Sequence, residues 1–157
     1  MDKKKILLID DEEDFCFFVK LNLEKTRKYQ VFTATDGMEG IRLAKQLKPD
    51  LIFLDIVMPK MDGGRIAEIL VEDEPTSTIP IVFVTGLIKE DELSGCGGKI
   101  GGRDFIAKPV KPETLIEKIE QYCPIQKEWR RGYRAGEQRR FPKLSRFRLP
   151  VPVPALP

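Results

Sequence analysis

Short apolar runs and helix-like apolar spacing alternate along the first 123 residues of the chain. Continuous apolar runs are typical of strands buried on both faces, and apolar residues recurring every three or four positions are typical of helices packed against a core. The alternation predicts an α/β fold, namely a doubly wound, five-stranded parallel sheet with helices on both faces. The expected strands cover residues 5–9, 30–34, 51–54, 79–85 and 104–107.

The segment of residues 87–103 departs from this alternation because it is rich in glycine. It contains Gly95, Gly97, Gly98, Gly101 and Gly102. Each glycine in a helix interior costs about 1 kcal/mol relative to alanine. We therefore expect only a short helix here, followed by a flexible connector.

Charge and proline content change near residue 123. The first 123 residues carry 18 Lys and Arg against 23 Asp and Glu, whereas residues 124–157 carry 9 against 2 and hold 6 of the 12 prolines. We expect a folded domain over residues 1–123 and a basic, proline-rich tail over residues 124–157 that is disordered or a truncated output segment. Arginines alternate with aromatic residues in this tail, which also suits binding of nucleic acid or of an acidic partner.

The overall composition, with 41% hydrophobic and 33% charged residues, is typical of a folded globular protein. No apolar run approaches the roughly 20 residues that cross a membrane. Two aspartates end the N-terminal apolar run after four residues, which is unlike a signal peptide. We expect a cytoplasmic protein with no membrane partner.

Cysteine and histidine usage narrows the kinds of site that the chain can hold. Cys16, Cys96 and Cys123 are odd in number and lack metal-ligand spacing, so we expect reduced thiols of minor structural importance. Redox sensing at Cys96 is the alternative. Because the chain contains no histidine, it has no His-based catalytic triad or His metal site, and it cannot carry phosphohistidine.

Five polar residues stand where predicted strands end: Asp10, Asp11, Asp55, Thr85 and Lys108. The carboxyl ends of parallel strands meet at one edge of a sheet, so these side chains are expected to lie together. Clustered carboxylates repel unless a cation intervenes, and Mg²⁺ is the hard cation that prefers such oxygen ligands. An aspartate can also act as a nucleophile and form an acyl phosphate. Taken singly, Asp10 and Asp11 also fit a solvated turn and Asp55 a loop cap, while Thr85 and Lys108 carry almost no signal.

Four stretches of the sequence resemble the receiver domain of two-component response regulators. They are KILLIDD at residues 5–11, LIFLDIVMPKMDG at 51–63, PIVFVTG at 80–86 and DFIAKP at 104–109. The resemblance covers residues 4–122 and implies a flavodoxin-like sheet with strand order 2-1-3-4-5. It implies a phosphorylation-controlled switch in a two-component phosphorelay.

The resemblance also implies a role for each residue of the Mg²⁺ site. Asp55 would accept a phosphoryl group from a phosphohistidine on a histidine kinase or a phosphotransfer protein. Asp11 and Asp55 would bind Mg²⁺ directly, Asp10 would bind it through water, and the backbone carbonyl of Val57 would supply a further ligand. The apolar Val57 side chain cannot orient a hydrolytic water, so we expect a long-lived phosphorylated state.

Switching residues follow from the same resemblance. Thr85 would turn towards the phosphoryl group, Lys108 would pair with it, and Phe105 would occupy the aromatic switch position. The Lys108-Pro109 bond would be cis. The output partner is open, and a homodimer induced by phosphorylation is one candidate.

Two other functions remain as alternatives. A degenerate receiver would bind a partner constitutively, without phosphorylation. An aspartate-nucleophile phosphatase would need a second acid two residues after Asp55, and Val57 stands there. The tail weakly resembles the arginine-rich opening of PilZ domains, which bind cyclic di-GMP, but it ends at Pro157 without the β-barrel that such domains continue into.

Overall fold

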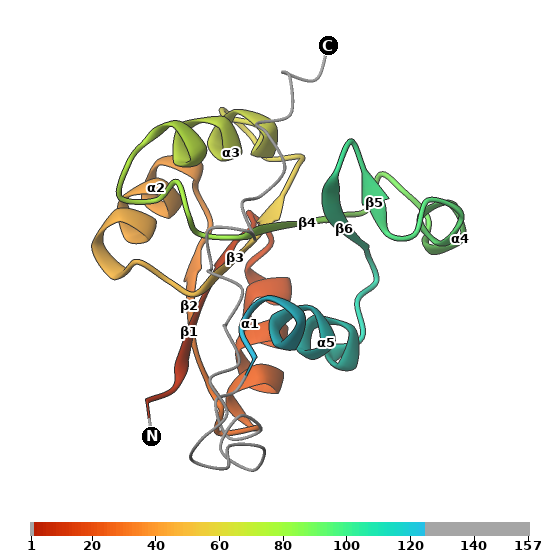
Figure 1. The fold of residues 1–157 in the computed structure, drawn as a ribbon, viewed down its shortest axis with the longest axis horizontal. Coiled ribbons are helices and arrows are strands. Elements are labelled where there is room, and N and C mark those ends of the chain that lie inside the picture. Colours follow the sequence, from red (N-terminus) through yellow and green to blue (C-terminus); the bar gives the residue numbers. More distant parts are fainter. Residues whose placement is uncertain (1, 125–157) are drawn as a thin grey trace, which may run out of the picture.

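A central sheet organises residues 2–124, the part of the chain that this computed structural model describes (Figure 1). Its strands are β1 (Lys4–Ile9), β2 (Tyr29–Ala34), β3 (Leu51–Asp55), β4 (Ile81–Thr85), β5 (Lys99–Ile100) and β6 (Arg103–Ala107). The helices are α1 (Glu13–Glu24), α2 (Gly37–Leu47), α3 (Gly63–Glu72), α4 (Glu90–Gly95) and α5 (Pro112–Tyr122). The predictions for the tail fall on residues that lie outside the described part, apart from Pro124.

The sheet runs in the order β2-β1-β3-β4-β6-β5. Strands β2, β1, β3, β4 and β6 are mutually parallel, which confirms the predicted fold class and the order of the five parallel strands. The predicted total of five strands is wrong, because β5 adds a sixth strand antiparallel to β6 at the edge.

Glycine geometry explains the extra strand. Gly101 and Gly102, which link β5 to β6, have φ angles of 58° and 79°. Two successive positive φ angles are what a tight hairpin turn requires, and glycine adopts them without strain. The short helix expected in residues 87–103 is present as α4, but the connector after it folds back as a hairpin instead of remaining irregular.

Two apolar clusters fill the spaces on either side of the sheet. Strand β1 contributes alternate residues to both, because successive side chains of a strand point to opposite faces. Its Ile6 and Leu8 belong to the cluster that includes buried residues of α1 and α5, while Leu7 and Ile9 belong to the cluster that includes buried residues of α2, α3 and α4. Figure 1 shows this division, with α1 and α5 on one side of the sheet and α2 and α3 on the other. Burial on both faces explains the continuous apolar run of β1.

The described cysteines are all free. Cys16 and Cys123 are buried, and Cys96 is exposed at the end of α4. Burial raises the pKa of Cys16 to about 12 and that of Cys123 to about 11. Within residues 2–124, no helix combines the length and the apolar character needed to cross a membrane.

Candidate functional site

The carboxyl edge of the sheet gathers the residues that the sequence analysis singled out. Asp10 directly follows β1, Asp55 ends β3, Thr85 ends β4 and Lys108 directly follows β6. One oxygen from each of Asp10, Asp11 and Asp55 lies within 4.8 Å of the others. The structure therefore places the three carboxylates in one cluster, as expected from the ends of adjacent parallel strands.

Lys108 forms ion pairs with two carboxylates of this cluster. Its Nζ atom lies 2.7 Å from Asp10 Oδ2 and 3.8 Å from Asp55 Oδ2. The peptide bond between Lys108 and Pro109 is cis, as predicted. Lys108 N donates a hydrogen bond of 2.8 Å to the backbone oxygen of Thr85, so the ends of β4 and β6 are joined within the site.

Burial makes the negative charge of the cluster costly. Asp10 is fully buried and Asp55 is 5% exposed. Burial, together with the charge of Asp10, raises the pKa of Asp55 to about 6, although Lys108 opposes the shift. Burial also raises the pKa of Asp10. A single ammonium thus leaves the carboxylates incompletely neutralised.

These properties fit a divalent cation. Asp10 Oδ1 accepts a hydrogen bond from Glu12 N, but Asp10 Oδ2 has no hydrogen-bond partner among the described residues and makes only the ion pair with Lys108. Clustered oxygens with unmet charge are the donor set that Mg²⁺ prefers. Asp10, Asp11 and Asp55 are the residues that would hold it.

The raised pKa of Asp55 has a consequence for stability that can be measured without metal. A carboxyl group whose folded pKa exceeds its unfolded value of 3.8 favours folding at low pH, and this contribution is lost as the pH rises to about 6. At about 1.4 kcal/mol per pKa unit, the loss amounts to roughly 3 kcal/mol. In the presence of a chelator, we expect Asp55→Asn to become more stable than the wild type as the pH rises from 4 to 7. Urea unfolding of both proteins across this range measures the difference, and a difference independent of pH would contradict the prediction.

Thr85 and Phe105 are both held inside the fold. Thr85 is fully buried, and its Oγ1 accepts a hydrogen bond of 3.1 Å from Leu87 N. Phe105 is 7% exposed, and its ring stacks on Phe83 at 5.1 Å between centroids. The predicted switch residues therefore lie on neighbouring strands, β4 and β6.

Val57 lies beside Asp55 at the surface. Its backbone N–H donates to Asp55 Oδ1 at 3.3 Å, and 55% of the residue is exposed. The valine side chain is thus an open apolar group next to the carboxylate. No polar side chain occupies the position two residues after Asp55, where a general acid would stand in a phosphatase.

Two residues of the site were missed by the sequence analysis, Glu12 and Phe15. Glu12 Oε1 lies 3.1 Å from Lys108 Nζ, and the same ammonium lies 4.4 Å from the centroid of the Phe15 ring. The only available signal was that Glu12 continues the acidic run after Asp11. Its partner is 96 positions away in the sequence, and the contact depends on how α1 leaves the sheet.

An open groove of about 580 Å³ adjoins this group. Residues from the start of α1, the end of β4 and the loop between β6 and α5 line it: Glu12, Phe15, Phe18, Gly86, Lys108, Pro109 and Val110. The groove combines aromatic rings with the ammonium that faces Asp55. It lies next to the carboxylate cluster, because Lys108 belongs to both.

Comparison with known proteins gives consistent results. The family described as "Response regulator receiver domain" matches residues 6–120. Protein PilH of Pseudomonas aeruginosa is 40% identical over 116 residues, covering 73% of this chain and 93% of PilH. The DNA-binding dual master transcriptional regulator RpaA of Synechocystis is 38% identical over 116 residues, and here the match covers 73% of this chain but only 47% of RpaA.

A solved structure supports the fold. The receiver domain of the sensor histidine kinase PA1611 from Pseudomonas aeruginosa superposes with a TM-score of 0.65 at 23% identity, covering 77% of this chain and 98% of that domain. That structure contains a magnesium ion coordinated in its active site cleft.

Proposed function

Because the chain belongs to the response regulator receiver domains, which are phosphorylation-controlled switches of two-component signalling, we propose that Asp55 is its phosphoryl acceptor. The observation that carries the proposal is the position of the Asp55 carboxylate. It ends β3 within reach of two further carboxylates and of the Lys108 ammonium. This combination provides a nucleophile, a cation site and a group that pairs with a transferred phosphoryl group.

The donor in this proposal is a phosphohistidine of a histidine kinase or of a phosphotransfer protein. An oxygen of Asp55 attacks phosphorus, the phosphorus–nitrogen bond breaks, and the electron pair of that bond stays on the histidine of the donor. The groove lined by Phe15 and Phe18 lies next to Lys108 and gives an apolar surface on which such a donor can dock.

Mg²⁺, held by Asp10, Asp11 and Asp55 with the Val57 carbonyl, would neutralise the charge of the carboxylates and of the phosphoryl oxygens. The chain's own groups do the rest. Lys108 pairs with a phosphoryl oxygen as a compact point charge. Thr85 Oγ1 accepts from Leu87 N, so its own O–H is free to donate to a phosphoryl oxygen.

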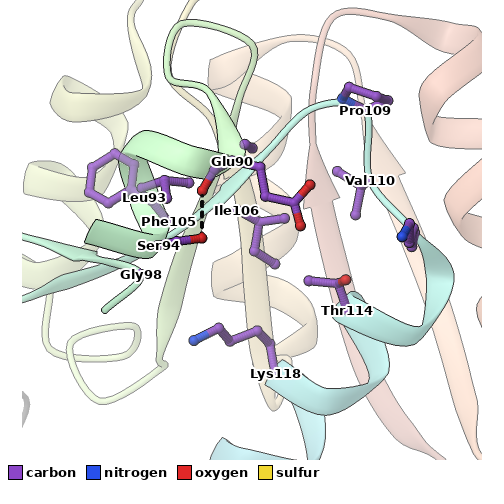
Figure 2. Close-up of a pocket in the computed structure, with 12 residues that line it drawn as sticks. Glu90, Leu93, Ser94, Gly98, Phe105, Ile106, Pro109, Val110, Thr114 and Lys118 are labelled. Atoms are coloured by element: carbon purple, nitrogen blue, oxygen red, sulfur yellow. Dashed lines mark hydrogen bonds between the residues drawn. The ribbon is translucent and has the colours of Figure 1, made fainter. Parts of the chain in front are cut away.

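The output step in this proposal takes place between α4 and α5. A pocket of about 210 Å³ lies there, and Phe105 and Lys118 are among the residues around it (Figure 2). Phosphorylation adds roughly one to two negative charges at Asp55, which favours conformations in which Thr85 and Lys108 contact them. A shift of Thr85 and Phe105 would change this surface for an output protein or a second copy of the chain. We propose no separate enzymatic activity for the described residues.

Val57 provides a prediction about the lifetime of the phosphorylated state. Replacing it by asparagine places a polar group where a hydrolytic water can be oriented, so we expect Val57→Asn to lose its acyl phosphate faster, by about tenfold. Following the decay of phosphorylated protein after removal of the donor measures this. A matched control is Leu21→Asn, which changes another exposed apolar residue, in the last turns of α1. Unchanged or slower decay in Val57→Asn would contradict the prediction.

Acetyl phosphate, a small phosphoryl donor, separates the proposal from its alternatives. The proposed switch takes up one phosphoryl group in a reaction that requires both Mg²⁺ and Asp55, as measured by intact-protein mass. A degenerate receiver takes up none. A phosphatase releases phosphate steadily from a small ester without accumulating the modified protein. Binding of candidate partners with and without beryllofluoride then identifies the output.

A further inference from the structure

The Lys108 ammonium has more neighbours than its proposed role requires. It lies 2.7 Å from Asp10, 3.1 Å from Glu12 and 3.8 Å from Asp55, with the Phe15 ring 4.4 Å away. The longest of the three ion-pair distances is the one to the proposed acceptor. In this arrangement the ammonium is drawn towards the start of α1 and away from Asp55.

We propose that Glu12 and Phe15 form a resting seat for Lys108, which it leaves when Asp55 is phosphorylated. This inference rests on the proposed function and makes Glu12 a positioning residue that acts through Lys108. The unmodified protein keeps the ammonium between Asp10 and Glu12. The phosphorylated protein transfers it from Glu12 to a phosphoryl oxygen.

The local structure leaves the Glu12 carboxylate available for this role. Glu12 is the N-cap residue of α1, yet its side chain makes no capping hydrogen bond. Its backbone N–H donates to Asp10 Oδ1 at 2.9 Å, which fixes the residue next to the carboxylate cluster. The side chain of Glu12 is 63% exposed, and that of Lys108 is 15% exposed. Glu12 is therefore the neighbour that Lys108 can leave without exposing a buried charge.

The contacts of Lys108 with Glu12 and Phe15 oppose its pairing with a phosphoryl group. A phosphoryl group carries more charge than a carboxylate and attracts the ammonium more strongly, so the exchange is favourable once the group is present. To pair with the phosphoryl group, however, Lys108 first has to lose its contacts with Glu12 and Phe15. Weakening the seat should therefore strengthen binding of a phosphoryl group without altering the residues that hold it.

The test uses beryllofluoride, a non-covalent phosphoryl mimic, and the full chain at saturating Mg²⁺. We expect Glu12→Gln to lower the apparent dissociation constant about two- to fivefold, the size expected for a partly exposed ion pair. Phe15→Leu, which removes the ring and keeps an apolar side chain, should act in the same direction. The matched control is Glu13→Gln, which removes a neighbouring exposed charge of α1 that has no described ion pair with Lys108.

A double-mutant cycle shows whether the effect passes through Lys108. In a Lys108→Met background, Glu12→Gln should no longer change beryllofluoride affinity, whereas a general charge effect would persist. The proposal is wrong if Glu12→Gln and Glu13→Gln change beryllofluoride affinity equally. It is also wrong if Glu12→Gln still changes that affinity in the Lys108→Met background. If the wild type binds beryllofluoride and takes up phosphate but Glu12→Gln behaves identically, only the seat is wrong. If the wild type does neither, the proposed function itself fails.

Discussion

Asp55→Asn should take up no phosphoryl group from acetyl phosphate and Mg²⁺, while the wild type gains one. The amide nitrogen and oxygen of asparagine cannot replace the carboxylate as a nucleophile, so no acyl phosphate can form. The substitution keeps the size of the side chain and an acceptor for the Val57 N–H. The loss of labelling would therefore be chemical and not a consequence of unfolding. We expect incorporation to fall by at least about a hundredfold, to the limit of detection.

Asp91→Asn is the matched control for this experiment, since Asp91 is an exposed aspartate of α4 outside the carboxylate cluster. It should be labelled as fast as the wild type. Peptide mapping of the wild type after borohydride reduction locates the modified residue. A phosphoryl group found on Asp10 or Asp11, or undiminished labelling of Asp55→Asn, would show that the acceptor has been assigned wrongly.

Gly63→Ala should cause the largest loss of stability of any single methyl addition near the site. Gly63 begins α3, and its N–H donates to Ile56 O at 2.8 Å. A Cβ atom at this position would overlap the backbone oxygen of Asp55 and lie 2.8 Å from Ile56 Cα. Both neighbours are backbone atoms that cannot rotate away, so the loop between β3 and α3 has to move. We expect a loss of about 3 kcal/mol in the free energy of unfolding.

Urea unfolding measures this loss, and Gly95→Ala is the control because a Cβ there would meet no atom within 4 Å. That variant should be no less stable than the wild type, because alanine favours a helix over glycine by up to about 1 kcal/mol. Because the displaced backbone is that of Asp55, the folded fraction of Gly63→Ala should also take up phosphate more slowly. Wild-type stability in Gly63→Ala would mean that the close approach of Gly63 to the backbone of Asp55 and Ile56 is not maintained in solution.

The fold class was predictable from the apolar pattern, and the order of the five parallel strands from the family resemblance. A strand segment buried on both faces needs apolar residues at every position, and residues 6–9 of β1 and 51–54 of β3 meet that condition. Strand β5 has no such signal, since it is two residues long and neither is buried. Its pairing depends on the φ angles of Gly101 and Gly102, which composition indicated only as a break in the helix pattern.

The contacts within the candidate site were likewise only partly predictable from the sequence. A general rule about parallel sheets is enough to bring Asp10, Asp55 and Lys108 to one edge, so their proximity was predictable from strand ends. The contacts of Lys108 with Glu12 and Phe15 were not, because they depend on the direction in which α1 leaves β1. No periodicity in the sequence encodes that direction. Residue roles such as those of Thr85 and Phe105 remain predictions until phosphorylation is measured.

The distribution of the cysteines has a practical consequence for such measurements. At neutral pH, burial and raised pKa values protect Cys16 and Cys123 from alkylation, whereas Cys96 is open to solvent at the end of α4. A maleimide dye should attach there without any engineered substitution. Residues of α4 line the same pocket as Phe105. The fluorescence of a dye on Cys96 would therefore report movement of that surface in real time in the unaltered chain.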